Sequence, residues 1–113
     1  MEKSNPRVIK DIAEAFLTLT EERYIKNIEI EYHTALLIAF SAKESLFKAL
    51  YPLTKIYFGF DAARISKIEE KSRFFTMELL VSLSKDFPIG SQYRGCYKIY
   101  KGYIITVIST DGI

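Results

Sequence analysis

The first third of the chain carries apolar and polar residues at helical spacing. In residues 8–17 (VIKDIAEAFL) apolar side chains recur at i, i+4, i+7 and i+8, so a first helix is expected there. Residues 18–21 (TLTE) match the S/T-x-x-E capping box, in which two side chains satisfy two free backbone donors at a helix start. This motif predicts a second, short helix that runs to about Asn27.

A longer helix is expected from about Tyr32 to Leu50. This stretch holds no Gly or Pro and is rich in Ala, Leu and other strong helix formers. Tyr51-Pro52 is expected to end it, because proline lacks the backbone N–H that a continuing helix uses.

The second half changes to β-branched and aromatic residues that alternate with polar ones, which is typical of strands. The segments are FDAARISKI (60–68), RFFTMELLVSLS (73–84), YRGCYKIY (93–100) and YIITVIST (103–110). Lys101-Gly102 predicts a hairpin turn between the last two, and FPIG (87–90) predicts a turn or loop. Helices followed by strands indicate an α+β fold, with N-terminal helices packed on a C-terminal antiparallel sheet. No repeat or linker interrupts residues 1–113, so a single domain is expected.

Composition narrows the class of protein. The 113 residues, 49% of them hydrophobic, suffice for one domain with a core. A net charge of +2 argues against a nucleic-acid partner held by bulk electrostatics and leaves room for a small anionic ligand. With Cys96 as the one cysteine and no segment resembling a signal peptide, a cytoplasmic protein is expected. The most apolar run, ALLIAF, is far shorter than the ~20 residues of a membrane helix, so no membrane partner is expected.

Residues 40–50 (FSAKESLFKAL) place three charges within an otherwise apolar helix. At about 100° per residue the polar positions share one narrow arc with a single leucine. The members of this arc are Thr34, Leu37, Ser41, Glu44, Ser45 and Lys48. Lys43 falls outside this arc, among apolar residues. Its ammonium must either extend past the edge of the core or meet an anion, because an unpaired buried charge is costly. Glu44 and Lys48 are either a surface i,i+4 pair or part of a site for a charged ligand.

The same stretch resembles the signature helix of the 4'-phosphopantetheinyl transferases, (W/F)-(S/A)-x-K-E-(S/A)-x-x-K. The matching residues are Phe40, Ser41, Lys43, Glu44, Ser45 and Lys48. The similarity extends to the Thr-x-x-Glu segment about twenty residues upstream and to F-x-F-D (58–61) downstream. Order and spacing look most like the enterobactin synthase component D and surfactin-type branch, whose chains hold two similar lobes. The resemblance covers the second, C-terminal lobe only, over nearly all of this chain.

The resemblance implies a Mg²⁺-dependent transfer of the phosphopantetheine arm of coenzyme A to a serine of an acyl or peptidyl carrier protein. Such carriers serve siderophore, nonribosomal peptide or fatty acid biosynthesis. Glu44 would ligate the metal, and Lys43 and Lys48 would hold the pyrophosphate, with Lys48 facing it. Glu44 or a metal-bound water would accept the serine proton, and the sequence leaves both open. The expected catalytic residues are therefore Glu44 and Lys48, and the expected coenzyme-binding residues Lys43 and Lys48.

One departure from the family pattern concerns the metal. The family's G-(I/V)-D-x-E motif has no counterpart here, although Glu2 lies near the position of its Glu and is expected as a second metal ligand. The chain is therefore expected to need a partner lobe or self-association into a homo-oligomer for activity. The alternative is a non-catalytic interaction module or a degenerate fragment of such an enzyme.

Overall fold

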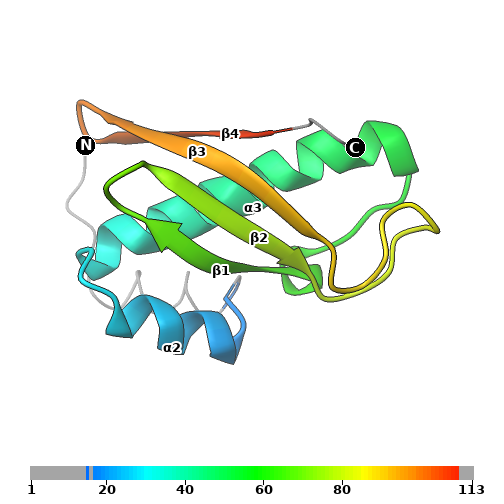
Figure 1. Ribbon diagram of the computed structural model, residues 1–113, viewed down its shortest axis with the longest axis horizontal. Coiled ribbons are helices and arrows are strands. Elements are labelled where there is room, and N and C mark those ends of the chain that lie inside the picture. Colours follow the sequence, from blue (N-terminus) through cyan, green and yellow to red (C-terminus); the bar gives the residue numbers. More distant parts are fainter. Residues whose placement is uncertain (1–14, 16, 110–113) are drawn as a thin grey trace.

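The computed structural model describes residue 15 and residues 17–109. The elements are α2 (Leu19–Asn27), α3 (Tyr32–Thr54), the 3₁₀ turn η1 (Phe60–Ala62), β1 (Ala63–Glu69), β2 (Phe74–Leu79), β3 (Gln92–Tyr100) and β4 (Tyr103–Ile108). The helix expected over residues 8–17 lies, apart from positions 15 and 17, outside the described residues, as does Glu2. Helices that precede a four-stranded antiparallel sheet confirm the α+β prediction (Figure 1).

The short helix α2 starts as its sequence predicts. Thr18 is the N-cap residue, and its hydroxyl accepts from the Glu21 backbone N–H at 3.2 Å. The Glu21 carboxylate accepts from the Thr18 N–H at 2.9 Å, which completes the capping box. The helix ends at Asn27, where the sequence placed its end.

The long helix α3 continues past the point where the sequence placed its end. Pro52 lies inside the helix, which runs to Thr54. A proline lacks its own bond to the carbonyl four residues back and crowds that carbonyl, but here other contacts hold the last turn. The Thr54 hydroxyl donates to the Leu50 carbonyl at 3.1 Å, and Lys55 takes a left-handed conformation (φ 58°) and donates its N–H to the Tyr51 carbonyl at 2.7 Å.

The sheet has the order β1-β2-β3-β4 with every pair antiparallel. Lys101 (φ 48°) and Gly102 (φ 82°) form the two-residue turn between β3 and β4, as the sequence predicts. The second strand is shorter than expected over 73–84. It ends at Leu79, and residues 80–91 form a loop instead, in which Leu83 and Phe87 return to the core.

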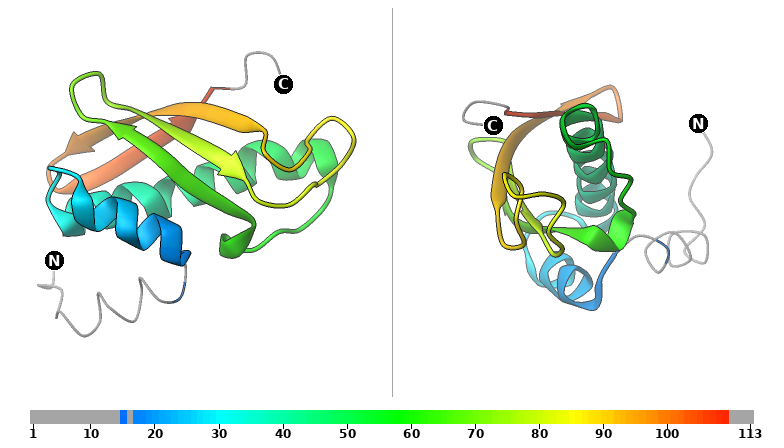
Figure 2. Two further views of the ribbon diagram at one scale, coloured as in Figure 1. Left: turned by 60° about the horizontal axis from the view of Figure 1, so that its bottom comes forward. Right: turned by 90° about the vertical axis from the view of Figure 1, so that its right-hand side faces the viewer.

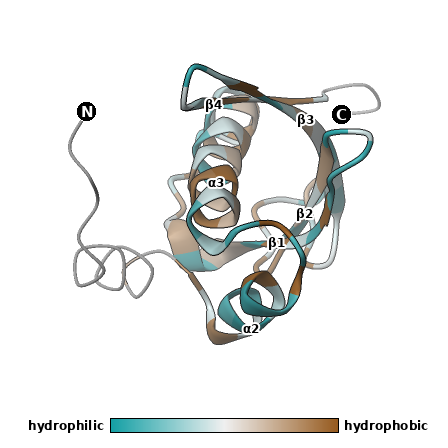
Figure 3. Cartoon of the chain, turned by 90° about the vertical axis from the view of Figure 1, so that its left-hand side faces the viewer, coloured by the Kyte–Doolittle hydropathy of each residue, from teal (hydrophilic) through white to brown (hydrophobic). Residues whose placement is uncertain are grey.

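The sheet curves around α3, and α2 lies beneath β1 (Figures 2 and 3). The core between them includes the largest fully buried apolar side chains, which are Phe75, Ile25, Ile38, Leu46, Leu50, Ile65, Met77 and Leu79. Three small residues of α3, Ala35, Ala39 and Ala42, are fully buried in this core. Small side chains allow the helix to approach the sheet closely, and α3 therefore forms a rigid support along the whole concave face.

Both outer edges of the sheet are partly covered by helix side chains. On β1, the N–H groups of Ile65 and Ile68 donate to the Glu21 carboxylate at 2.6 Å and to the Tyr24 hydroxyl at 2.8 Å. On β4, the Thr106 carbonyl accepts from the Ser45 hydroxyl at 3.2 Å. Edge strands with free backbone groups invite pairing with other chains, and these contacts reduce that tendency.

Candidate functional site

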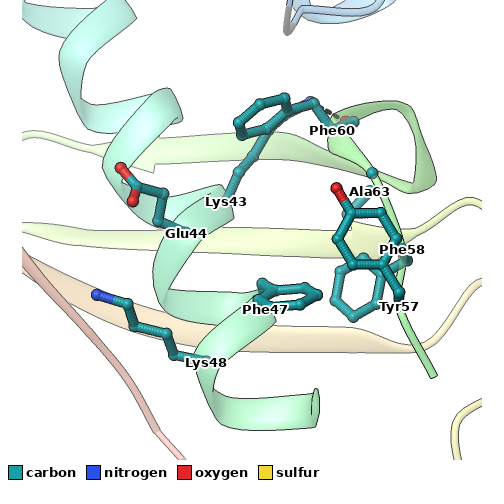
Figure 4. Close-up of a pocket in the computed structure, with 9 residues that line it drawn as sticks. Lys43, Glu44, Phe47, Lys48, Tyr57, Phe58, Phe60 and Ala63 are labelled. Carbon is teal, nitrogen blue, oxygen red and sulfur yellow. Dashed lines mark hydrogen bonds between the residues drawn. The ribbon is translucent and has the colours of Figure 1, made fainter. Parts of the chain in front are cut away.

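A pocket of about 190 Å³ lies between α3 and the segment that connects it to β1 (Figure 4). Its lining residues are Lys43, Glu44, Phe47, Lys48, Tyr57, Phe58, Gly59, Phe60 and Ala63. The pocket therefore brings together all three charged residues of the FSAKESLFKAL stretch. It adds a connecting segment, residues 57–60, whose side chains the sequence did not assign to a site.

The polar arc expected on α3 is divided between two surroundings. Ser41 and Ser45 face β4, where both hydroxyls lie within hydrogen-bond distance of the Thr106 hydroxyl, at 2.8 and 2.5 Å. Glu44 and Lys48 are exposed and extend to the same side of α3 (Figure 4). Ser41 and Ser45 thus contact the sheet, whereas Glu44 and Lys48 line the pocket and are accessible to a ligand.

Within residues 15 and 17–109, the ion pairs do not include Glu44 with Lys48. The surface i,i+4 pair offered by the sequence as one alternative does not form in this structure. Both charged groups therefore reach the solvent at the pocket without neutralising one another directly.

Lys43 is buried, with 4% of its surface exposed. Its ammonium lies 2.7 Å from a carboxylate oxygen of Glu21 and donates to the Phe60 carbonyl at 2.5 Å. Burial lowers the pKa of Lys43, and the neighbouring Glu21 carboxylate opposes that lowering. Of the two alternatives for this lysine, extension past the core edge is wrong. The side chain meets an anion, which is a carboxylate of the chain itself.

Glu21 is the site-related residue that sequence reasoning assigned only to helix capping. It is fully buried and accepts from the Thr18 N–H, the Lys43 ammonium and the Ile65 N–H. A capping glutamate normally lies at the surface, so its pattern gives no sign of burial. The available signal was Lys43, for which an anion was one of two alternatives, but nothing in the sequence indicates that the anion is a residue 22 positions away.

Aromatic residues form one side of the pocket, here called the aromatic wall and consisting of Phe47, Tyr57, Phe58 and Phe60. The Phe47 ring lies 5.5 Å from Tyr57 and 5.2 Å from Phe58, between ring centroids, in edge and tilted arrangements that aromatic pairs favour. Phe60 packs in turn on Phe40 of α3 at 5.6 Å. The wall is thus built from one α3 residue and the connecting segment, and it borders Glu44 and Lys48.

The residues fit a magnesium ion only in part. Mg²⁺ is usually held by one or two carboxylates together with substrate phosphates and waters, and Glu44 supplies one exposed carboxylate at the pocket. Glu2, expected as the second ligand, lies outside the described residues. In the described part of the chain, no three His, Cys, Asp or Glu side chains gather in a group that could hold a metal ion. Glu44 could therefore share a metal with phosphate oxygens, but these residues do not form a closed metal site.

Comparison with known protein families gives one match that spans most of the chain. The sequence model of the 4'-phosphopantetheinyl transferase superfamily matches residues 1–108. No curated protein matches the chain. The described residues include no helix long and apolar enough to cross a membrane.

Proposed function

Because the chain belongs to the 4'-phosphopantetheinyl transferase superfamily, we propose that it forms one lobe of an enzyme that modifies carrier proteins. Family membership points to phosphopantetheine transfer in general. The finer proposal is that coenzyme A is the donor, Mg²⁺ the metal, and a serine of an acyl or peptidyl carrier protein the acceptor. In this proposal residues 1–113 act as a single unit equivalent to the C-terminal lobe of the enterobactin synthase component D and surfactin-type enzymes.

In the proposed reaction the serine hydroxyl oxygen forms a bond to the phosphorus that carries the pantetheine arm. The pyrophosphate P–O bond breaks, and adenosine 3',5'-bisphosphate leaves with the electron pair. The serine proton passes to a base, for which Glu44 is this chain's candidate. Catalysis of phosphoryl transfer consists mostly of positioning and of neutralising charge on the phosphates.

The observation that carries this proposal is the position of Glu44 and Lys48 beside the pocket. Both are exposed and come from one turn of a rigid helix, so their spacing is fixed before a ligand binds. Glu44 would hold Mg²⁺ together with the pyrophosphate, and the ion, when bound, would neutralise phosphate charge. Lys48 would contact the pyrophosphate directly.

Lys43 was expected beside the pyrophosphate as well, and that role stays a prediction. Its ammonium is engaged by Glu21 and the Phe60 carbonyl. Direct contact with a phosphate would require this pairing to open, and the buried Glu21 carboxylate would then lose its cation. A contribution of Lys43 through the shape of the pocket needs no such rearrangement.

Activity is proposed to require a second lobe or self-association. Three apolar residues on the outer face of β4 are more than half exposed, namely Tyr103, Ile105 and Val107. Contiguous exposed apolar surface commonly marks a protein interface. A partner at the pocket would also supply the further carboxylate and basic groups that a coenzyme site needs.

The alternative function is an interaction module that binds a partner lobe or a carrier protein without transferring a group. The specific observation in its favour is that Glu44 is not grouped with two further metal-binding side chains within residues 15 and 17–109. A chain of this kind would bind its partner through the docking surface but would lack the groups needed to catalyse the transfer.

The experiment that separates the two functions is a titration of coenzyme A in the presence of Mg²⁺. The chain is measured alone and with a first-lobe polypeptide that carries the G-(I/V)-D-x-E motif. In the same mixtures an apo-carrier protein is added, and its mass is followed for a gain of the phosphopantetheine arm. Modification that depends on Mg²⁺ supports the enzyme.

The matched control replaces Glu44 by Gln, which keeps the size of the side chain and removes its charge. Loss of carrier modification in this variant, with folding retained, assigns the reaction to this chain. Binding of the first-lobe polypeptide without any coenzyme binding or carrier modification would instead identify the interaction module.

A further inference from the structure

The carboxylate of Glu21 connects segments that are far apart in the sequence. One oxygen accepts from the Thr18 N–H at the start of α2 and from the Lys43 ammonium of α3. The other accepts from the Ile65 N–H of β1 at 2.6 Å. A single fully buried side chain thereby fixes α2, α3 and β1 relative to one another.

The network continues from Lys43 into the wall of the pocket. The same ammonium donates to the carbonyl of Phe60, at the end of the connecting segment. That segment contributes Tyr57, Phe58 and Phe60 to the aromatic wall, next to Glu44 and Lys48. The hydrogen bond from Lys43 to the Phe60 carbonyl thus joins the wall to α3 (Figure 4), and its donor is also bound by Glu21.

We propose that Glu21 is a positioning residue that acts through Lys43 to hold residues 57–60 against α3, and so sets the shape of the pocket beside Glu44 and Lys48. The effect on ligand binding rests on the proposed function. The effect on the connecting segment does not, because it concerns the free protein.

The fold alone does not require a buried ion pair at this position. Replacing such a pair by well-packed neutral residues is commonly neutral or stabilising, so its presence is poorly explained by stability. The α2 cap needs only an acceptor for the Thr18 N–H, which an exposed carboxylate also supplies. The additional effect of the pair is to place the Lys43 ammonium where it donates to the Phe60 carbonyl of the pocket wall.

The test uses two variants and a matched control. Lys43→Met removes the bond to Phe60 and leaves the Glu21 carboxylate with its two backbone donors. Glu21→Gln combined with Lys43→Met removes both buried charges, so the core holds no unpaired ion. The control is Glu22→Gln combined with Lys26→Met, which removes the 2.8 Å ion pair on α2, whose two residues do not line the pocket.

Amide hydrogen exchange in the free protein reports on the connecting segment. The Ala62 N–H, which donates to the Gly59 carbonyl at 3.2 Å, marks the end of this segment. In Lys43→Met it should exchange about 10- to 100-fold faster than in the parent chain, as expected for a lost charge-assisted bond. In that variant the Ile65 N–H should exchange faster only as far as the loss of global stability requires, because Glu21 still accepts from it, whereas Ala62 should lose its local protection in addition. The control should match the parent at both amides.

The ligand half is measured as coenzyme A affinity with Mg²⁺ and the first-lobe polypeptide. The double variant should bind at least about 10-fold more weakly, which is the loss seen when a group that orients a metal ligand is removed. Unchanged Ala62 exchange in Lys43→Met overturns the positioning role. Faster exchange with unchanged coenzyme affinity overturns the link to the pocket. If the parent chain binds no coenzyme A in the presence of Mg²⁺ and the first-lobe polypeptide, the proposed function is overturned. The exchange result then decides the positioning role by itself.

Discussion

Breaking the Glu21–Lys43 pair from one side should destabilise the protein far more than removing both charges. Removing one member of a buried ion pair typically costs about 3–5 kcal/mol, because the other charge stays buried without compensation. Glu21→Gln should lie at the upper end of that range, since the Lys43 ammonium then loses its carboxylate while burial still disfavours its charge. Lys43→Met should lie at the lower end, because two backbone N–H groups still donate to Glu21.

The free energy of unfolding of the double variant should be higher than that of either single variant. The single costs of about 5 and about 3 kcal/mol add to about 8, whereas the double variant should cost less than about 3. The coupling energy between the two positions is then at least about 5 kcal/mol, well beyond the few tenths seen for independent sites. A domain of this size has a total stability of about 5–15 kcal/mol, so each single change should be plain in urea unfolding followed by far-ultraviolet circular dichroism. Thermal midpoints should fall by roughly 4 °C per kcal/mol.

The control for this cycle is the surface pair of Glu22 and Lys26 on the same helix. Lys26 is exposed and Glu22 is partly exposed, so removing this pair should change the unfolding midpoint little. If the Glu21 and Lys43 variants each lose less than about 1 kcal/mol and their effects simply add, the pair is not a buried, coupled interaction. The arrangement of the site around it would then need to be reconsidered.

Further predictions concern the exposed site residues, pH and association. Glu44→Gln should leave the thermal midpoint unchanged and weaken Mg²⁺-dependent coenzyme binding in calorimetry; a large loss of stability would show that Glu44 is structural. Lys48→Met should lower coenzyme affinity by about 1.5–3 kcal/mol in the complemented assembly, and an unchanged affinity would remove it from the site. Because burial holds the pKa of Lys43 below 10.5, the unfolded chain binds more protons just below pH 10.5, so stability rises with pH there. In Glu21→Gln the carboxylate that opposes this lowering is absent, so its free energy of unfolding should rise more than that of the parent between about pH 7 and about pH 10. Urea unfolding of both proteins at the two pH values tests this. Ile105→Lys should reduce association in sedimentation, whereas a parent chain that stays monomeric at high concentration would argue against the β4 face as an interface.

The elements predicted correctly from the sequence are those determined by neighbouring residues. The capping box of α2 depends on side chains three positions apart, and the hairpin at Lys101-Gly102 depends on a glycine that accepts positive φ. The predicted end of α3 was wrong, because Pro52 was expected to stop the helix. The final turn is instead held by Thr54 and Lys55. Both contacts join residues four positions apart, so they are local, and the prediction gave the proline too much weight against them.

The candidate site was predictable in its charged residues and not in its surroundings. Helical spacing brought Glu44 and Lys48 to one face and marked Lys43 as anomalous in an apolar arc. The identity of its anion depends on how α2 packs against α3, and the residues involved are 22 apart. The aromatic wall likewise forms only because residues 57–60 fold back onto α3. Tertiary packing therefore decided which motif residues remain available to a ligand.

The pairing of Lys43 also changes the charge that the pocket presents. With its ammonium bound to Glu21, the exposed groups of the FSAKESLFKAL stretch are Lys48 and Glu44, one of each sign. Asp61, on the nearby turn η1, is exposed and adds a negative charge. A ligand with several phosphate charges gains little attraction from such a surface, because opposite charges at similar distances largely cancel. Tight coenzyme binding therefore requires cations from elsewhere, such as Mg²⁺ on Glu44 and basic groups of a partner lobe, and the complemented assembly is the form in which binding should be measured.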